Sequence, residues 1–226
     1  MMRREPDLTG ITITAKPTSD LTDADVATMM SLFDIAYRDG NHAYLKKSFG
    51  TLRFAAIAMH GDTPAGFALG DARIVDLPRL PATVVSLAGI CCIDPAFRRR
   101  GLFSALTGGA WRLGEMPQSD RFLICGRMAH PAIFRTMRFN STHVPKPGIE
   151  PSEWQQEVGQ ALADIYGVAR FDPKTFVCHG SGVPIGYPNI DMELKPEEWR
   201  VFEHVNRDAG DSLLGIAWVP DGPDGW

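Results

Sequence analysis

The chain has 226 residues, of which 44% are hydrophobic and 22% charged, and its formal charge is −4 at pH 7. This composition is ordinary for a soluble globular protein, and the mild acidity argues against a general nucleic-acid binder, which would carry a broadly basic surface. The first ten residues lack the apolar core of a signal peptide, and no apolar run approaches the roughly 20 residues that span a bilayer. We therefore expect a cytoplasmic protein with neither a membrane nor a nucleic acid as partner.

The cysteines and histidines predict no disulfide and no metal site. Cys91 and Cys92 are adjacent within a predicted strand, and with Cys125 and Cys178 they form no Cys-x-x-Cys pair, so reduced thiols in a cytoplasm are the simplest interpretation. The histidines show no His-x-x-x-His or Cys/His ligand spacing, which argues against zinc.

The first third of the chain predicts a strand, two helices and a hairpin. Residues 11–15 alternate as a strand does, and Thr22 followed by Asp25 resembles a capping box before a helical stripe that reaches Tyr37. A short helix is expected over 43–49. Residues 53–59 and 66–75 read as strands, and the Gly-Asp-Thr-Pro turn between them pairs the two as a hairpin.

The centre of the sequence is a strand, a basic loop and a helix. Residues 83–93 end in an apolar run that reads as a buried strand, and Asp94 and Pro95 end it. Apolar residues at helical spacing follow from Leu102. Between them lie Arg98, Arg99, Arg100 and Gly101.

A helix N-terminus with unpaired N–H groups and adjacent guanidinium groups is suited to bind phosphate, and a glycine lets a ligand approach the backbone. The alternatives are a solvated basic loop that precedes a core helix, or a targeting stretch.

The rest of the chain predicts a parallel strand and several additional elements. Residues 121–126 form a strand that should lie parallel to 83–93 with a right-handed crossover, and a helix should run over 131–137. Ser152 with Gln155 resembles a second capping box, followed by a helical stripe. Beyond it we expect a strand over 175–179, a loop over 180–189, a helix from Pro196 through Val205 and a last strand over 213–219.

The stretch 93–103, IDPAFRRRGLF, resembles the acyl-CoA loop of the GNAT acyltransferase superfamily. The family pattern is Gln/Arg-x-x-Gly-x-Gly/Ala after a strand that ends in an apolar residue. Arg98 takes the first position and Gly101 the second, whereas Phe103 stands where the family has glycine or alanine. The order of elements around the loop strengthens the resemblance.

The resemblance implies a single domain over 1–226, with a mixed, mostly antiparallel central sheet, a splayed parallel pair in its middle and helices on both faces. The extra helices and loop fall in about 146–212, and they would shape an acceptor pocket or a homodimer contact. Acetyl-CoA would bind with its phosphates at Arg98, Arg99, Arg100, Gly101, Leu102, Phe103 and Ser104, and its pantetheine arm would follow the backbone of Cys91, Cys92 and Ile93. Tyr37, Asp39, His42 and Tyr44 would be candidates to face the acceptor amine.

The residues that many relatives use as acid and base are missing. Strand 83–93 contains no acidic residue, Phe134 stands in place of the usual tyrosine, and Arg138 in place of a glycine. His130, which precedes the following helix, is the candidate catalytic residue because its ordinary pKa near 6.5 suits proton transfer. The alternative is that His130 caps the helix.

These features predict an acyl-CoA-dependent N-acyltransferase that moves an acetyl group to an amine of a small molecule or peptide by direct attack in a ternary complex, without a metal. The alternative is a non-catalytic acyl-CoA-binding sensor or interaction domain of the same fold. A phosphate-ester enzyme is disfavoured, since the sequence lacks Gly-x-x-x-x-Gly-Lys-Ser/Thr and a metal-ligand cluster.

Overall fold

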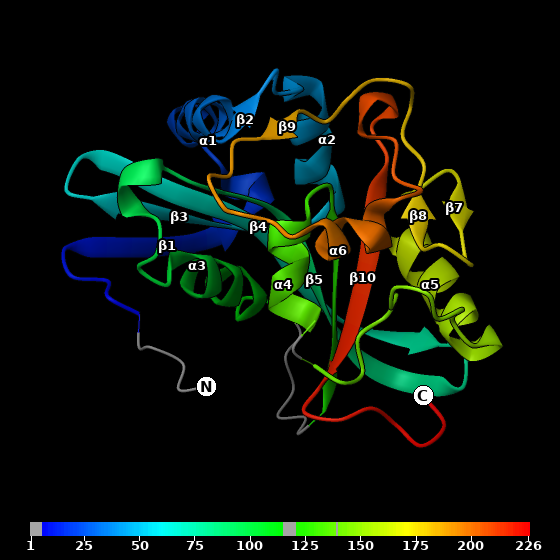
Figure 1. Ribbon diagram of the computed structural model, residues 1–226. Coiled ribbons are helices and arrows are strands. Elements are labelled where there is room, and N and C mark those ends of the chain that lie inside the picture. Colours follow the sequence, from blue (N-terminus) through cyan, green and yellow to red (C-terminus); the bar gives the residue numbers. More distant parts are fainter. Residues whose placement is uncertain (1–5, 115–120, 139) are drawn as a thin grey trace.

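The computed structural model describes residues 6–114, 121–138 and 140–226. An eight-stranded sheet with the order β1-β3-β4-β5-β6-β10-β8-β7 forms its centre (Figure 1). The strands are β1 (Ile11–Pro17), β3 (Phe54–His60), β4 (Thr63–Leu77), β5 (Leu80–Ile93), β6 (Phe122–Met128), β7 (Phe171–Asp172), β8 (Val177–Cys178) and β10 (Ser212–Val219). β2 (Tyr37–Arg38) and β9 (Tyr187–Pro188) pair separately.

The sheet is antiparallel except between β5 and β6. α3 (Leu102–Trp111) connects these two strands, as a parallel neighbour requires. The mixed, mostly antiparallel sheet with one central parallel pair confirms the predicted fold class.

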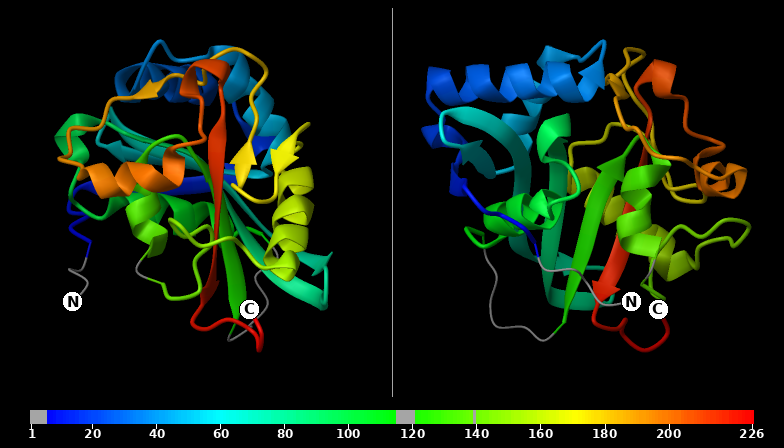
Figure 2. Two further views of the ribbon diagram at one scale, coloured as in Figure 1. Left: turned by 45° about the vertical axis from the view of Figure 1, so that its right-hand side comes forward. Right: turned by 60° about the vertical axis from the view of Figure 1, so that its left-hand side comes forward.

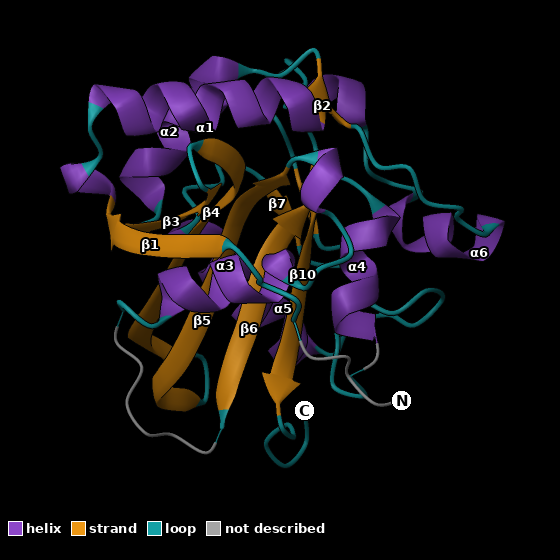
Figure 3. Cartoon of the chain, turned by 90° about the vertical axis from the view of Figure 1, so that its left-hand side faces the viewer, coloured by secondary structure: helices purple, strands orange, loops and turns teal. Residues whose placement is uncertain are grey.

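Helices cover both faces of the sheet (Figure 2, Figure 3). α3 and α4 (Pro131–Arg138) lie on one face, and α1 (Asp23–Ala36), α2 (His42–Thr51) and α5 (Glu153–Ile165) lie on the other. Both predicted capping boxes are formed, by Thr22 with Asp25 and by Ser152 with Gln155. None of the helices in the described ranges is long and apolar enough to cross a membrane.

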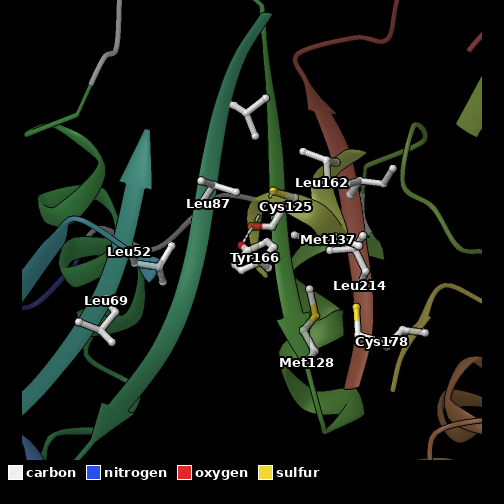
Figure 4. Packing of buried hydrophobic residues seen from close by; sticks show 14 of the residues in the cluster. Leu52, Leu69, Leu87, Cys125, Met128, Met137, Leu162, Tyr166, Cys178 and Leu214 are labelled. Carbon is white, nitrogen blue, oxygen red and sulfur yellow. Dashed lines mark hydrogen bonds between the residues drawn. The ribbon is translucent and has the colours of Figure 1, made fainter. Parts of the chain in front are cut away.

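Two apolar clusters hold these layers together. Small residues of β3 and β4 let α3 approach the sheet closely, with Leu102, Leu106 and Ala110 packed against them. The larger cluster joins α1, α2 and α5 to the opposite face, and Figure 4 shows part of it around β5, β6 and β10.

The last third of the chain differs from the sequence-based expectation in three places. The strand expected over 175–179 is reduced to Val177–Cys178, because Phe176 adopts a left-handed backbone with φ of 59°. The helix expected from Pro196 to Val205 ends at Trp199 and continues as a short 3-10 turn over Arg200–Phe202. The loop expected over 180–189 contains β9, which pairs with β2 near α1 and α2.

Candidate functional site

The two central strands part from one another and open a cavity. β5 and β6 pair only from Val85–Leu123 to Ala88–Gly126, whereas β5 stays paired with β4 as far as Ile93. A cavity of about 640 Å³ lies where they diverge, within the range of about 300–1,000 Å³ that is usual for small-molecule sites. Residues from both faces of the sheet line it, including Tyr44, Lys47 and Ser48 of α2, Phe103, Ser104, Thr107 and Trp111 of α3, and Ile133, Thr136 and Met137 of α4. The cavity therefore connects the α3–α4 face of the sheet with the α2 face.

Tyr166 fixes the point at which the strands separate. It follows the last turn of α5, and its hydroxyl lies 2.8 Å from the carbonyl oxygen of Ala88 on β5 and 3.1 Å from that of Cys125 on β6. Figure 4 shows the ring beside Cys125 and Leu87, between the two strands. Burial raises the pKa of Tyr166 well above its ordinary value, so the hydroxyl stays protonated and donates to these carbonyls. No sequence pattern indicated this residue, which also lines the cavity.

The basic loop precedes α3 as expected, and two of its arginines are held by the protein itself. Arg98 Nε donates to the carbonyl oxygen of Ile93 at 3.2 Å, and Arg100 donates to the carbonyl oxygens of Asp7 and Thr9 at 3.1 and 3.0 Å. A carbonyl acceptor orients a guanidinium without cancelling its charge, but Arg100 also lies 3.6 Å from Oδ1 of Asp7, and this carboxylate offsets part of its charge. Arg99 is exposed.

Gly101 is the residue before α3 and has a left-handed backbone with φ of 85°. The first turn of a helix leaves N–H groups without intrahelical partners, and in α3 these belong to Leu102, Phe103 and Ser104. The N-terminal segment packs on this loop, because a Cβ on Gly101 would lie 2.8 Å from Pro6 Cβ. Pro6 therefore covers the side of Gly101 on which a side chain would lie.

The predicted coenzyme-binding residues fall into three groups. Cys91, Phe103 and Ser104 line the cavity. Cys92 and Leu102 are buried in the two apolar clusters, on opposite faces of the sheet. Ile93 and the loop from Arg98 to Gly101 lie outside the cavity lining, next to the start of α3.

His130 lines the cavity and caps α4. Its Nδ1 accepts the backbone N–H of Ala132 at 3.2 Å, and its ring packs edge-on against Trp199. Burial, with the nearby charges of Arg207 and Arg135, holds the pKa of His130 below its ordinary value. The imidazole is therefore neutral at pH 7 with its proton on Nε2, which can donate a hydrogen bond, while the lone pair on Nδ1 accepts from Ala132.

Phe134, which stands where many relatives are said to have a tyrosine, does not belong to the described cavity lining. Its ring packs edge-on against Phe202 and His143 and faces Gly215 of β10. The short 3-10 turn that carries Phe202 belongs to the additional C-terminal elements, and it supplies the partner that turns this position into core.

Of the candidate acceptor-facing residues, Tyr37 and Tyr44 line the cavity, whereas Asp39 and His42 do not. His42 instead contacts Asp34 at 2.6 Å on the surface. No aspartate or glutamate lines the cavity within the described residues, and the fully charged groups there are Lys47 and Arg127.

The cysteines are poor nucleophiles. Burial raises the pKa of the Cys91 thiol, the only cysteine in the cavity lining that the structure describes, to about 12. Burial also raises the pKa of Cys125 to about 12 and of Cys178 to about 11. Because the thiolate is the reactive form, a covalent acyl-cysteine route is disfavoured.

Comparison with solved structures finds acetyltransferases. The chain is similar to the ribosomal-protein-S18-alanine N-acetyltransferase of Escherichia coli, with 10% identity, a TM-score of 0.41, and coverage of 95% of this chain and 99% of that one. It is similar to the aminoglycoside N-acetyltransferase AAC(6')-Iy in complex with CoA, with 14% identity, a TM-score of 0.36, and coverage of 52% and 82%. A GNAT-family protein from Desulfovibrio desulfuricans matches at 11% identity, a TM-score of 0.39, and coverage of 57% and 81%. No protein-family model and no curated protein sequence matches. Identities this low establish no activity for this chain.

Proposed function

We propose that the chain is an acyl-CoA-dependent N-acyltransferase that transfers an acetyl group from acetyl-CoA to an amine of a small molecule or peptide. The observation that carries this proposal is the fork between β5 and β6, with a cavity that runs through it and α3 beginning beside one of its mouths. A long, thin donor that enters between the strands and an acceptor that approaches from the other face would meet inside the sheet.

In this proposal the diphosphate of the donor binds at the N-terminus of α3. The N–H groups of Leu102, Phe103 and Ser104, which have no intrahelical partners, and the positive end of the helix dipole favour an anion there. Arg98 donates to a carbonyl oxygen and keeps its charge, exposed Arg99 adds a second cation, and Asp7 offsets part of the charge of Arg100. The pantetheine arm would follow Cys91, Cys92 and Ile93, where β5 has no β6 partner.

The reaction that fits the cavity is direct attack of the amine on the thioester. The amine nitrogen bonds to the carbonyl carbon, the C–S bond breaks, and the amine proton passes to water while the thiolate leaves as CoA. The raised pKa of Cys91 disfavours an acyl-enzyme step. Since no carboxylate lines the described cavity, the amine would enter as its free base.

His130 remains the proposed catalytic residue, as a hydrogen-bond donor. Its Nε2–H would stabilise the oxyanion or the departing thiolate, which is worth a few kcal/mol at most for a single donor, roughly 2.7–4 kcal/mol in well-formed oxyanion holes. With Nδ1 already accepting from Ala132, it would serve neither as base nor as full proton donor.

The test is release of free thiol from acetyl-CoA in the presence of a panel of amines. We expect thiol release that depends on the amine. Arg99→Gln should raise the KM for acetyl-CoA, whereas Arg112→Gln, which removes an equally exposed charge at the other end of α3, should not. Binding of acetyl-CoA without turnover for any amine would instead favour a sensor domain, the alternative that the absence of a carboxylate from the described cavity lining supports.

A further inference from the structure

The charges at the α2 end of the cavity are of one sign. Lys47 projects from α2 and Arg127 from β6, and both belong to the cavity lining. No aspartate or glutamate accompanies them in the lining that the structure describes. A cavity meant for a cationic acceptor would present carboxylates at this point, so the charge pattern favours an acceptor of the opposite sign.

Arg127 is held in place by uncharged groups. Its Nε donates to the hydroxyl of Ser212 at 3.0 Å, and its guanidinium lies 5.9 Å from the ring centre of Tyr44. It also contacts the thiol of Cys178, whose pKa of about 11 keeps it neutral. Across the described ranges no carboxylate oxygen lies within ion-pair distance of Arg127. A half-buried guanidinium with this environment retains donors for a bound anion.

Asp211, the residue before Ser212, has hydrogen-bond partners other than Arg127. Asp211 is 6% exposed, and it accepts the backbone N–H groups of Gly180 at 2.8 Å and Asn206 at 3.2 Å. It also lies 3.5 Å from His179. Asp211 therefore fixes the loops around β8 and β10, and the charge of Arg127 is left for another partner.

Arg127 also stands at the right place along the sheet. The last pair of the parallel ladder joins Ala88 to Gly126, so Arg127 is the first residue of β6 beyond the fork. Its contact with Tyr44 places the guanidinium on the α2 face, whereas α3 and the arginine loop lie on the other face. Arg127 is thus remote from the proposed diphosphate site and close to where the acceptor would bind.

We propose that the acceptor is an amine that also carries an anionic group, and that Arg127, assisted by Lys47, binds this group. The inference rests on the proposed acyltransferase function and specifies its substrate class. The two cations also favour the neutral form of the nearby amine, because like charges lower the pKa of an ammonium group. Arg127 therefore orients the acceptor, and the two positive charges raise the fraction of the amine that is present as the free base and able to attack.

The experiment compares acceptors that share a skeleton and differ in charge. Phenethylamine, phenylalaninamide, phenylalanine and the aminophosphonate of the phenylalanine skeleton are tested by thiol release at one pH with saturating acetyl-CoA. We expect kcat/KM for the anionic amines to exceed that for the neutral ones by about 10- to 100-fold, the factor that charge-assisted hydrogen bonds supply. Preference for the phosphonate over the carboxylate would identify the anion as phosphoryl, and the reverse as carboxylate.

Three variants assign the effect to the site. Arg127→Met should abolish the ratio of anionic to neutral kcat/KM, and Arg127→Lys should keep part of it, which covers the case in which the methionine variant fails to fold. Lys47→Gln should reduce the ratio. Lys46→Gln is the matched control, because Lys46 is its exposed neighbour on α2 outside the cavity lining and its loss should leave the ratio unchanged.

Two results would overturn the inference: a wild-type preference for neutral or cationic amines, or an anionic preference that survives in Arg127→Met. Turnover with neutral amines alone would refute this substrate class and leave the acyltransferase proposal standing. If no amine turns over, calorimetry with N-acetylphenylalanine and N-acetylphenethylamine in the presence of CoA still decides. Binding of the first and not of the second supports the anion site, and equal or absent binding of both rejects it.

Discussion

Tyr166→Phe tests whether the fork between β5 and β6 depends on one hydroxyl. The change removes a single oxygen atom, and the ring that packs in the apolar cluster stays. Two carbonyl oxygens, those of Ala88 and Cys125, lose the donor that lies 2.8 and 3.1 Å away. The side chain is 7% exposed, so water replaces that donor poorly.

A buried acceptor left unsatisfied costs about 1–3 kcal/mol. For a domain of this size each kcal/mol lowers Tm by about 2–4 °C, so we expect Tm to fall by about 2–12 °C. Because the two carbonyls belong to the strands that bound the cavity, the KM for acetyl-CoA should also rise. Thermal unfolding and thiol-release kinetics measure the two effects.

Tyr187→Phe is the matched control. Its hydroxyl bonds to Asp208 at 2.5 Å on the surface, where water can take over, so Tm should change by less than about 2 °C. Equal Tm and KM values for wild type and Tyr166→Phe would show that the fork is held by the strands alone, which would refute the role assigned to Tyr166.

Four further predictions concern α3, the donor site and His130. At Gly109 a Cβ would lie 3.4 Å from Ala56 Cβ, which is ordinary contact, so Gly109→Ala should stabilise the fold by up to about 1 kcal/mol through helix propensity. Gly109→Leu should instead destabilise it by about 1–3 kcal/mol through overpacking. Urea unfolding measures both effects, and a leucine variant as stable as the wild type would disprove close packing. The affinity for acetyl-CoA, measured by calorimetry, should weaken as salt rises from about 50 mM to about 500 mM, because the screening length falls from above 10 Å toward 4–5 Å. An affinity independent of salt would argue against binding of the diphosphate at the arginine loop. His130→Gln should lower kcat without removing a limb above about pH 6.5, because the pKa of His130 lies below that ordinary value. Loss of such a limb would mean that His130 exchanges protons. Because the pKa of His130 is lower in the folded than in the unfolded chain, the unfolded chain binds the proton more readily than the folded chain below about pH 6.5. The free energy of unfolding should therefore fall as the pH drops below that value, and it should fall less in the glutamine variant.

Local signals in the sequence were sufficient for the elements that frame the site. The alternation of β1, the capping boxes before α1 and α5, and the strand–loop–helix unit around Gly101 each depend on neighbours within a few residues, and each is found where the pattern indicated. The parallel pairing of β5 with β6 followed from the helix between them.

The contacts that the sequence did not indicate join segments that are distant along the chain. Phe134 is core because Phe202, which belongs to the additional C-terminal elements, packs against it. Tyr166 reaches Ala88 from 78 positions away, and Pro6 covers Gly101 from the other end of the chain. No periodicity or short motif encodes such a pairing, and a single sequence therefore gave no signal for it.

The charge distribution offers one physical explanation for a cavity whose described lining contains no carboxylate. One mouth adjoins the positive end of α3 and its arginines, and the other carries Lys47 and Arg127. A thioester attacked by an amine develops negative charge on the carbonyl oxygen and then on sulfur, and positive charge on nitrogen until a proton leaves. Two positive regions on either side of the reacting atoms stabilise the first two charges, as preorganised dipoles and cations do in other sites. They destabilise the third, so attack needs an amine that arrives as its free base and passes a proton to water as the C–N bond forms. In such a cavity the electric field of the surrounding residues would do the work of a general acid and a general base, and the acceptor's own pKa would set the pH dependence of the rate.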